Sequence, residues 1–190
     1  MKAAAPARFD PIPMELIDGK VVMMSPRPRL SHNRVVTRIA HIFEGYLEGK
    51  PCISYSDGAD VYLDEKNHFI PDVMIVCNHD IIHEDAIYGA PDLVVEVLSP
   101  STMNYDRGPK LEAYSRAGVR EYWLVSPLAR TVEVYLNHDG ALAFDCVYED
   151  VPDWELERMD ADDRKNVHMD LKVSLYDDLI IPVRDIFYKM

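Results

Sequence analysis

One stretch decides the fold of this chain: Pro91-Asp92-Leu93-Val94-Val95-Glu96-Val97-Leu98-Ser99-Pro100. Its centre, from Leu93 to Leu98, is apolar except for Glu96. An apolar run of this length predicts a strand that is covered on both faces. A carboxylate inside such a strand is expensive to remove from water unless it is protonated, paired with a cation or bound to a metal. Glu96 is therefore the first candidate functional residue.

The residues that follow predict a helix and a second strand. After the loop 99–108, the run from Pro109 to Ala117 has a helical composition, with Pro109 suited to the first helical position and Gly118 to the position just past the end. Residues 119–125 are rich in aromatic and apolar side chains and predict another strand. Strand, helix and strand at this spacing form a right-handed βαβ crossover with parallel strands.

Lys110 is the second candidate. In a βαβ unit the helix begins near the carboxyl end of the first strand, so Lys110 and Glu96 are expected at the same edge of the sheet. In the first helical turn the macrodipole disfavours a cation by about 0.3–1 kcal/mol, which suggests an anionic partner. Two interpretations stay open at this point: a functional site, or an internal ion pair that only steadies the crossover.

A further acid, Asp72, precedes another stretch that is apolar on both faces, residues 73–77. Asp92 is the alternative to Asp72 as the acid that acts together with Glu96, because each of the two follows a proline. Asp92 and Glu96 are four residues apart in one strand, about 13 Å at about 3.3 Å per residue, which is too far for one shared ion. Asp72, on a separate strand, can approach Glu96 across the sheet. Two carboxylates can hold Mg²⁺ against a phosphodiester, and a lysine can stabilise the charge that develops.

Composition indicates one soluble domain over residues 1–190, because 48% hydrophobic content at this length supports a substantial core. No apolar run reaches the roughly 20 residues of a membrane span, and residues 1–10 lack a secretory signal, so we expect a cytoplasmic protein with no membrane partner. Cys52, Cys77 and Cys146 are odd in number and form no CxxC pair, which argues against a disulfide framework and a thiolate zinc site.

The flanking segments predict the remaining elements. Asp18-Gly19 is typical of a two-residue hairpin turn near the N-terminus. Ser31 can cap a helix that runs to about Glu48 and covers the sheet. Residues 53–63 favour a hairpin or bent strand, residues 69–77 a strand, residues 131–147 a hairpin, residues 149–163 a solvated connection, and residues 171–181 one or two late strands.

Histidines are weaker candidates. His32, near the start of the predicted helix, could contact a phosphate or a carboxylate, or could be a solvated first-turn residue. His79 and His83 are four residues apart, but the glutamate of HExxH is absent between them, and a loop is at least as good an interpretation as a metal site.

Several motifs together resemble a known family, the Uma-type restriction-endonuclease-like proteins of the PD-(D/E)xK nuclease superfamily. The resemblance covers nearly the whole chain. The motifs are Glu15-Leu16-Ile17-Asp18-Gly19, Met24-Ser25-Pro26, Pro71-Asp72, Ala90-Pro91-Asp92-Leu93-Val94-Val95-Glu96-Val97-Leu98-Ser99-Pro100-Ser101-Thr102, Asp106, Lys110, Tyr114 and Ala117-Gly118-Val119-Arg120-Glu121-Tyr122-Trp123.

This resemblance implies an α/β fold: a restriction-endonuclease-like mixed β-sheet flanked by helices, with an N-terminal β-hairpin and additional C-terminal strands. It also implies a site in which Asp72 and Glu96 bind Mg²⁺, or Mn²⁺ in its place, with Lys110 as the third catalytic residue. The superfamily lysine two residues after the second acid is absent, because position 98 is leucine. Asp92 and Asp106 are expected to support these groups or to be turn-forming acids, and Tyr114 is expected in the core.

The expected function is that of a divalent-metal-dependent endonuclease that hydrolyses DNA phosphodiester bonds. A homodimer is expected too, since related nucleases often pair to cut two strands. The net charge of −13 opposes this, because phosphate binding usually depends on a basic surface. Four arginines around the first predicted helix could form a restricted positive edge or could equally be ordinary surface residues: Arg27, Arg29, Arg34 and Arg38. The alternatives are a catalytically silent nuclease-fold binding or regulatory module, and a hydrolase of smaller phosphoesters.

Overall fold

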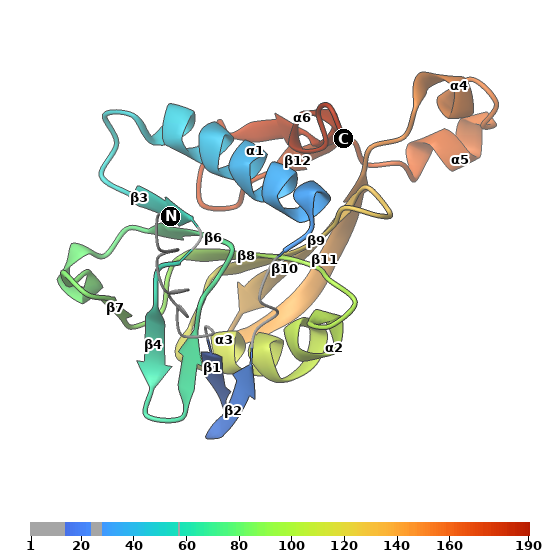
Figure 1. Ribbon diagram of the computed structural model, residues 1–190. Coiled ribbons are helices and arrows are strands. Elements are labelled where there is room, and N and C mark those ends of the chain that lie inside the picture. Colours follow the sequence, from blue (N-terminus) through green and yellow to red (C-terminus); the bar gives the residue numbers. More distant parts are fainter. Residues whose placement is uncertain (1–13, 24–27, 57) are drawn as a thin grey trace, which may run out of the picture.

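The computed structural model describes residues 14–23, 28–56 and 58–190, and the strands below are those of these ranges (Figure 1). The larger sheet has six strands in the spatial order β11 (Ala141–Glu149), β10 (Thr131–His138), β9 (Glu121–Ser126), β8 (Leu93–Val97), β6 (Val73–Val76) and β3 (Ile53–Ser56). The smaller has five in the order β2 (Lys20–Met23), β1 (Met14–Ile17), β5 (Asn67–Phe69), β4 (Val61–Asp64) and β7 (Ile87–Tyr88). A separate ribbon pairs β12 (Asp170–Lys172) with β13 (Ile180–Pro182).

Helices lie on both faces of the larger sheet (Figure 1). On one face lie α1 (Leu30–Leu47), the β12–β13 ribbon and α6 (Val183–Ile186). On the other lie α2 (Met103–Tyr105), a π-helical turn η2 (Asp106–Lys110), α3 (Leu111–Ala117) and the smaller sheet. A 3₁₀ turn η1 (His79–Ile81) follows β6, and α4 (Asp153–Leu156) and α5 (Ala161–Lys165) project from one end. None of the described helices combines the length and apolarity that a bilayer crossing needs.

The central strand is β8, in which every residue from Leu93 to Val97 is buried. It pairs in parallel with β9 and antiparallel with β6, so the predicted βαβ crossover is confirmed. Successive side chains of a strand point to opposite faces. Val95 and Val97 therefore join the core under α1, whereas Val94 joins the core under α3, and Glu96 shares the α3 face.

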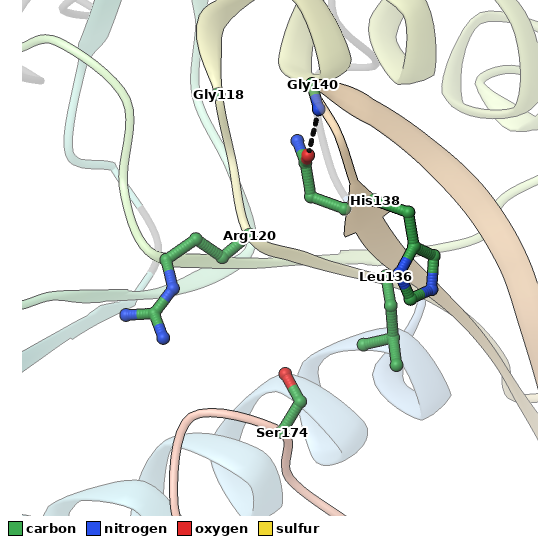
Figure 2. Close-up of a pocket in the computed structure, with 7 residues that line it drawn as sticks. Gly118, Arg120, Leu136, His138, Gly140 and Ser174 are labelled. Atoms are coloured by element: carbon green, nitrogen blue, oxygen red, sulfur yellow. Dashed lines mark hydrogen bonds between the residues drawn. The ribbon is translucent and has the colours of Figure 1, made fainter.

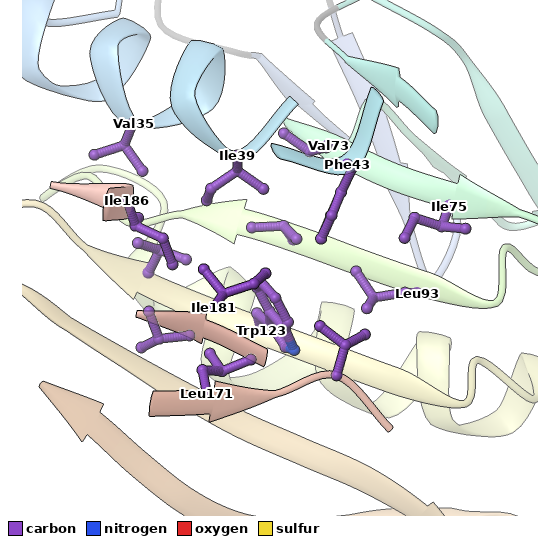
Figure 3. Close-up of a cluster of buried hydrophobic side chains, with 14 of the residues drawn as sticks. Val35, Ile39, Phe43, Val73, Ile75, Leu93, Trp123, Leu171, Ile181 and Ile186 are labelled. Atoms are coloured by element: carbon purple, nitrogen blue, oxygen red, sulfur yellow. The ribbon is translucent and has the colours of Figure 1, made fainter. Parts of the chain in front are cut away.

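The core under α1 holds that helix in place on the sheet. Val35, Ile39 and Phe43 lie four residues apart on its apolar face and point toward the sheet (Figure 3). The rings of Phe43 and Trp123 are 5.5 Å apart. Each large aliphatic or aromatic side chain buried in this way contributes roughly 1.5–3 kcal/mol. The first turn of α1, which carries His32, is thus held at the end of the sheet.

The helix of the crossover begins earlier than its sequence predicts. Helical residues start at Met103 and continue through η2 to Ala117, so Pro109 lies inside the helical segment. Proline lacks the N–H that an α-helix needs and its ring collides with the preceding turn, and the wider π turn accommodates it. Lys110 consequently does not lie in a first turn, and the macrodipole argument for its partner does not apply. Gly118 ends the helix at φ 91°, as predicted.

Two strand predictions were wrong because the chain changes sheets. The segment 53–63 does not form a hairpin: β3 belongs to the larger sheet and β4 to the smaller one. Residues 69–77 are not one strand, since β5 and β6 also lie in different sheets. The hairpins at Asp18-Gly19 and at residues 131–147 are confirmed. The α1 helix begins at Leu30, with Arg29 rather than Ser31 at its cap.

The argument against a disulfide was also wrong for two of the three cysteines. Cys52 and Cys77 form a disulfide, and Cys146 is free. The antiparallel register of β3 and β6 pairs Ile53 with Val76. Cys52, which precedes β3, and Cys77, which follows β6, therefore lie side by side. This pairing depends on strand register, which the spacing of the cysteines does not reveal.

Candidate active site

Strand register brings Asp72 to Glu96. In the antiparallel pair of β6 and β8, Val73 lies opposite Val95, so one step further along the same register puts Asp72 opposite Glu96. The backbone N–H of Val97 donates to Asp72 Oδ2 at 2.7 Å. Glu96 is buried, while the side chain of Asp72 is 18% exposed. The two carboxylates therefore lie side by side where the sheet ends, with Asp72 on the side that solvent reaches.

Lys110 lies against this pair. Its Nζ is 2.6 Å from Glu96 Oε1, 3.0 Å from Glu15 Oε1 and 3.7 Å from Asp106 Oδ1, and all four residues are buried. The structure thus brings together Asp72, Glu96, Lys110 and Asp106, and it adds Glu15 from β1. We refer to these five residues as the acid–lysine cluster.

Glu15 is the site residue for which sequence reasoning assigned no role. It occupies an inward position of β1, as does Ile17, and its Oε1 also accepts the backbone N–H of Ile70 at 3.0 Å. An acid at the inward position of an alternating strand was an available signal, because inward positions normally carry apolar side chains. The N-terminal hairpin consequently supplies part of the site.

Charges in the cluster are unbalanced. Burial raises the pKa of Glu96 well above its ordinary value; Lys110 opposes that rise, and Asp106, Asp72 and Glu15 add to it. Burial likewise raises the pKa of Asp106. Burial alone would lower the pKa of Lys110, but Glu96, Glu15 and Asp106 outweigh it and raise that pKa, so the amine stays charged. One ammonium facing four carboxyl groups leaves an excess of negative charge that a proton or a divalent cation can neutralise.

Tyr114 is buried as expected, and it also has a polar role. Its hydroxyl donates to Glu96 Oε1 at 2.9 Å. Burial, and next the charge of Glu96, raise the pKa of Tyr114 well above its usual range, so the phenol keeps its proton. Glu96 Oε1 is thus held by both Tyr114 and Lys110.

His32 contacts a carboxylate, one of the roles that its position allowed. Its Nε2 is 3.3 Å from Asp72 Oδ2, and its side chain is 17% exposed. The contact joins the first turn of α1 to the end of β6. Asp72 Oδ2 is therefore approached by both His32 and the Val97 N–H.

A groove of about 940 Å³ opens over the cluster. Pro28, Arg29 and the first turns of α1, as far as Ala40, line it on one side. The loop 98–102 after β8 and the turn 126–128 after β9 also line it. Asp72, Glu96, Lys110, Asp106 and Glu15 all contribute to its lining. A ligand in the groove can therefore reach the acid–lysine cluster.

Of the predicted arginine cluster, Arg29 is the member that lines the groove among the described residues, whereas Arg34 and Arg38 do not line it. Arg34 Nε donates to the carbonyl of Tyr188 at 3.3 Å, and Arg38 Nε donates to the carbonyl of Asp185 at 2.9 Å. Arg29 lines the groove, and Arg27 lies outside the described residues. Two of these arginines therefore hold the C-terminal segment against α1.

Asp92 is not part of this site and is an acid at the start of a strand, one of the two roles left open for it. It lies just before β8, at the opposite end from Leu98, where its Oδ2 accepts the Cys77 N–H at 2.7 Å and its Oδ1 is 3.3 Å from Arg120 Nη1. The length of the strand separates it from the cluster.

The histidine pair is not a metal site either. His79 Nε2 donates a hydrogen bond to the carbonyl of Pro51, and the ring of His83 packs edge-on against Tyr88.

The donor set of the cluster fits a magnesium-like ion. Within the described residues, no group of three or more His, Cys, Asp or Glu is arranged around a metal position. Mg²⁺ does not require such a cage, because it keeps several waters and is bound by one or two carboxylates together with substrate phosphate oxygens. Asp72 and Glu96 are two adjacent carboxylates at the groove, and hard cations prefer these oxygen donors.

A second hollow, of about 360 Å³, lies at the other end of β9 (Figure 2). Gly118, Arg120, Asn137, His138 and Ser174 are among its lining residues, which include no carboxylate. The Gly140 N–H donates to Asn137 Oδ1 at 3.0 Å, which closes the β10–β11 turn. This hollow lacks the donor set of the groove over the acid–lysine cluster.

The mixed sheet with helices on both faces is of the restriction-endonuclease-like class. The chain belongs to the Uma2 family, whose description is "Putative restriction endonuclease" and whose pattern matches residues 6–160. The uncharacterised protein slr1290 of Synechocystis sp. is 30% identical over 152 residues, which are 79% of this chain and 74% of that protein.

A solved structure has the same fold. It is a "putative nuclease belonging to DUF820" from Anabaena variabilis, and it superimposes with a TM-score of 0.65 over 93% of this chain and 90% of that one. The two sequences are 18% identical, so this likeness concerns the fold alone.

Proposed function

We propose that this chain is a divalent-metal-dependent endonuclease that hydrolyses DNA phosphodiester bonds. The observation that carries the proposal is the placement of Asp72 and Glu96 side by side at a groove, with Lys110 Nζ 2.6 Å from Glu96 Oε1. Membership of a family described as "Putative restriction endonuclease" supports it.

Each residue of the cluster has a role in this proposal. Asp72 and Glu96 would hold Mg²⁺ or Mn²⁺. When bound, such an ion polarises a phosphoryl oxygen and lowers the pKa of water. Lys110, which stays charged, stabilises the negative charge that develops on the phosphate. Tyr114 fixes Glu96 by its hydrogen bond, and Glu15 fixes Lys110 by its ion pair.

The test is cleavage of supercoiled and single-stranded DNA with Mg²⁺ or Mn²⁺, comparing the native chain with Asp72→Asn and Glu96→Gln. Both changes remove a charge while keeping the size and an acceptor oxygen, and both should lower the cleavage rate by at least about 100-fold, on the scale of losing an electrostatic contribution in the transition state. Glu112→Gln is the matched control, because Glu112 is exposed on α3 and does not line the groove. Unchanged cleavage in Asp72→Asn would refute the assignment.

A catalytically silent binding module is the second candidate. The observation that favours it is that Lys110 forms ion pairs with three buried carboxylates and can therefore be a purely structural group. A native protein that cleaves no DNA and binds no divalent ion in calorimetry would support this candidate over the nuclease.

A further inference from the structure

We infer that the groove takes a short unpaired stretch of a DNA strand rather than an intact duplex. This inference rests on the proposed function and names the substrate class of the same site. It starts from the cations in the groove. Among the described lining residues these are Arg29, His32 and Lys110. Lys110 is enclosed by Glu15, Glu96 and Asp106, and His32 contacts Asp72.

Arg29 is thus the lining residue whose positive charge no carboxylate of the cluster engages in the described structure. Arg34 and Arg38, on α1, do not line the groove and donate to carbonyls of the C-terminal segment. Proteins that bind duplex DNA commonly neutralise about 6–10 phosphates with lysine and arginine. One such guanidinium among the described lining residues, in a chain of net charge −13, suits the groove to one or two phosphates besides the scissile one.

The rest of the lining is neutral and suits unpaired nucleotides. Leu128, at the turn after β9, is 96% exposed, and Pro100 and Pro127 lie along the same groove. Such apolar groups offer contact to base faces, which are open in a single strand and stacked inside a duplex.

Hydroxyl groups supply the neutral hydrogen-bond donors. Ser99 Oγ is 2.9 Å from Ser101 Oγ and 3.0 Å from Thr102 Oγ1, in the loop that follows Glu96 and β8. These side chains line the groove, and serine and threonine hydroxyls bind phosphate and sugar oxygens without adding charge.

The size of the groove agrees with a short segment. A volume of about 940 Å³ falls within the range of roughly 300–1,000 Å³ that encloses small ligands. The enclosed space of the groove is thus on the scale of a few nucleotides of one strand.

The experiment is fluorescence anisotropy of a labelled eight-nucleotide single strand and a 20-base-pair duplex, with Ca²⁺ in place of Mg²⁺, from 50 to 400 mM KCl. The single strand should bind at least tenfold more tightly, with a slope of log K against log salt of about −0.7 to −1.4, as one or two phosphate contacts imply. Arg29→Ala should make that slope shallower by about 0.7. Arg164→Ala is the control: it removes the same charge from exposed α5 and should leave the slope unchanged.

Leu128→Ala provides an independent variant, since this exposed side chain is not needed for folding. It should weaken single-strand binding by up to about tenfold, because an apolar side chain buried by the ligand is worth about 1.5 kcal/mol. Duplex binding that is equal or tighter, a slope of −4 or steeper, or no binding of the single strand would each overturn the inference.

Hydrolysis of bis(p-nitrophenyl) phosphate with Mn²⁺ separates this inference from the proposed function. Hydrolysis that Asp72→Asn abolishes, together with absent single-strand binding, would overturn the inference and leave the phosphodiesterase chemistry standing. If the protein neither hydrolyses this substrate nor binds DNA, both the inference and the proposed function are overturned.

Discussion

Replacing Lys110 by Met tests the acid–lysine cluster most directly. Methionine keeps much of the aliphatic volume but removes the ammonium from three buried carboxylates, Glu15, Glu96 and Asp106. Breaking a buried ion pair by removing one partner costs about 3–5 kcal/mol. For a chain of this size each kcal/mol lowers the melting temperature by about 2–4 °C, so a fall of roughly 6–20 °C is expected at pH 7.5.

The pH dependence of this loss follows from the sign of the pKa shifts. Lys110 lowers the pKa of Glu96 and of Asp106, so its removal raises both further above their values in the unfolded chain. A carboxyl group whose folded pKa is raised binds a proton more readily in the folded state, so it favours folding at low pH and this contribution is lost as pH rises. Between pH 7.5 and 5.5 one such proton restores up to about 2.7 kcal/mol.

Urea unfolding followed by tryptophan fluorescence measures both effects, because Trp123 is fully buried. Lys172→Met is the control: it removes an exposed lysine from β12 and should change the free energy of unfolding by less than about 0.5 kcal/mol. A Lys110→Met protein that is destabilised by less than about 1 kcal/mol at pH 7.5, or whose deficit relative to the native chain grows toward pH 5.5, would refute the reasoning.

The remaining predictions concern single contacts. Tyr114→Phe removes a hydrogen bond to Glu96 and should lower the free energy of unfolding by about 1.5–3 kcal/mol in urea titration, and a change below about 0.5 kcal/mol would contradict the contact. His32→Asn should weaken Mn²⁺ binding by about 10–100-fold in calorimetry if the His32–Asp72 contact orients a metal ligand, whereas His41→Asn, exposed on the same helix, should not. Reduction of the Cys52–Cys77 disulfide, which spans 25 residues, should cost about 3.5 kcal/mol of stability. Alkylation of the unfolded chain followed by mass measurement should count one thiol before reduction and three after it; three labelled thiols without reduction would contradict the disulfide.

Local features of the fold were predictable from the residues. The apolar run around Glu96 predicted a covered strand, Asp18-Gly19 predicted a hairpin, and Gly118 predicted the end of a helix. Each of these depends on side-chain periodicity or on backbone conformations accessible to a few neighbouring residues. The fold class that the family resemblance implied agrees with the structural likeness.

The placement of Asp72 near Glu96 was also predictable from the sequence. Asp72 precedes one buried strand and Glu96 lies within another, and two such acids can meet across a sheet. The exclusion of Asp92 from that position follows from the length of a strand alone. The contacts of Asp92 with Cys77 and Arg120 could be identified only from the structure.

What the sequence determined by itself was therefore the central covered strand, the βαβ crossover, two of the hairpins and the acids that needed partners. Only the tertiary structure decided that Glu15 meets Lys110 across 95 residues, that Tyr114 holds Glu96, and that Cys52 lies beside Cys77. The physical reason is that periodicity and turn chemistry act over a few residues. Contacts between distant segments depend on strand register and sheet assignment, where a shift of one residue would point every side chain of a strand to the other face.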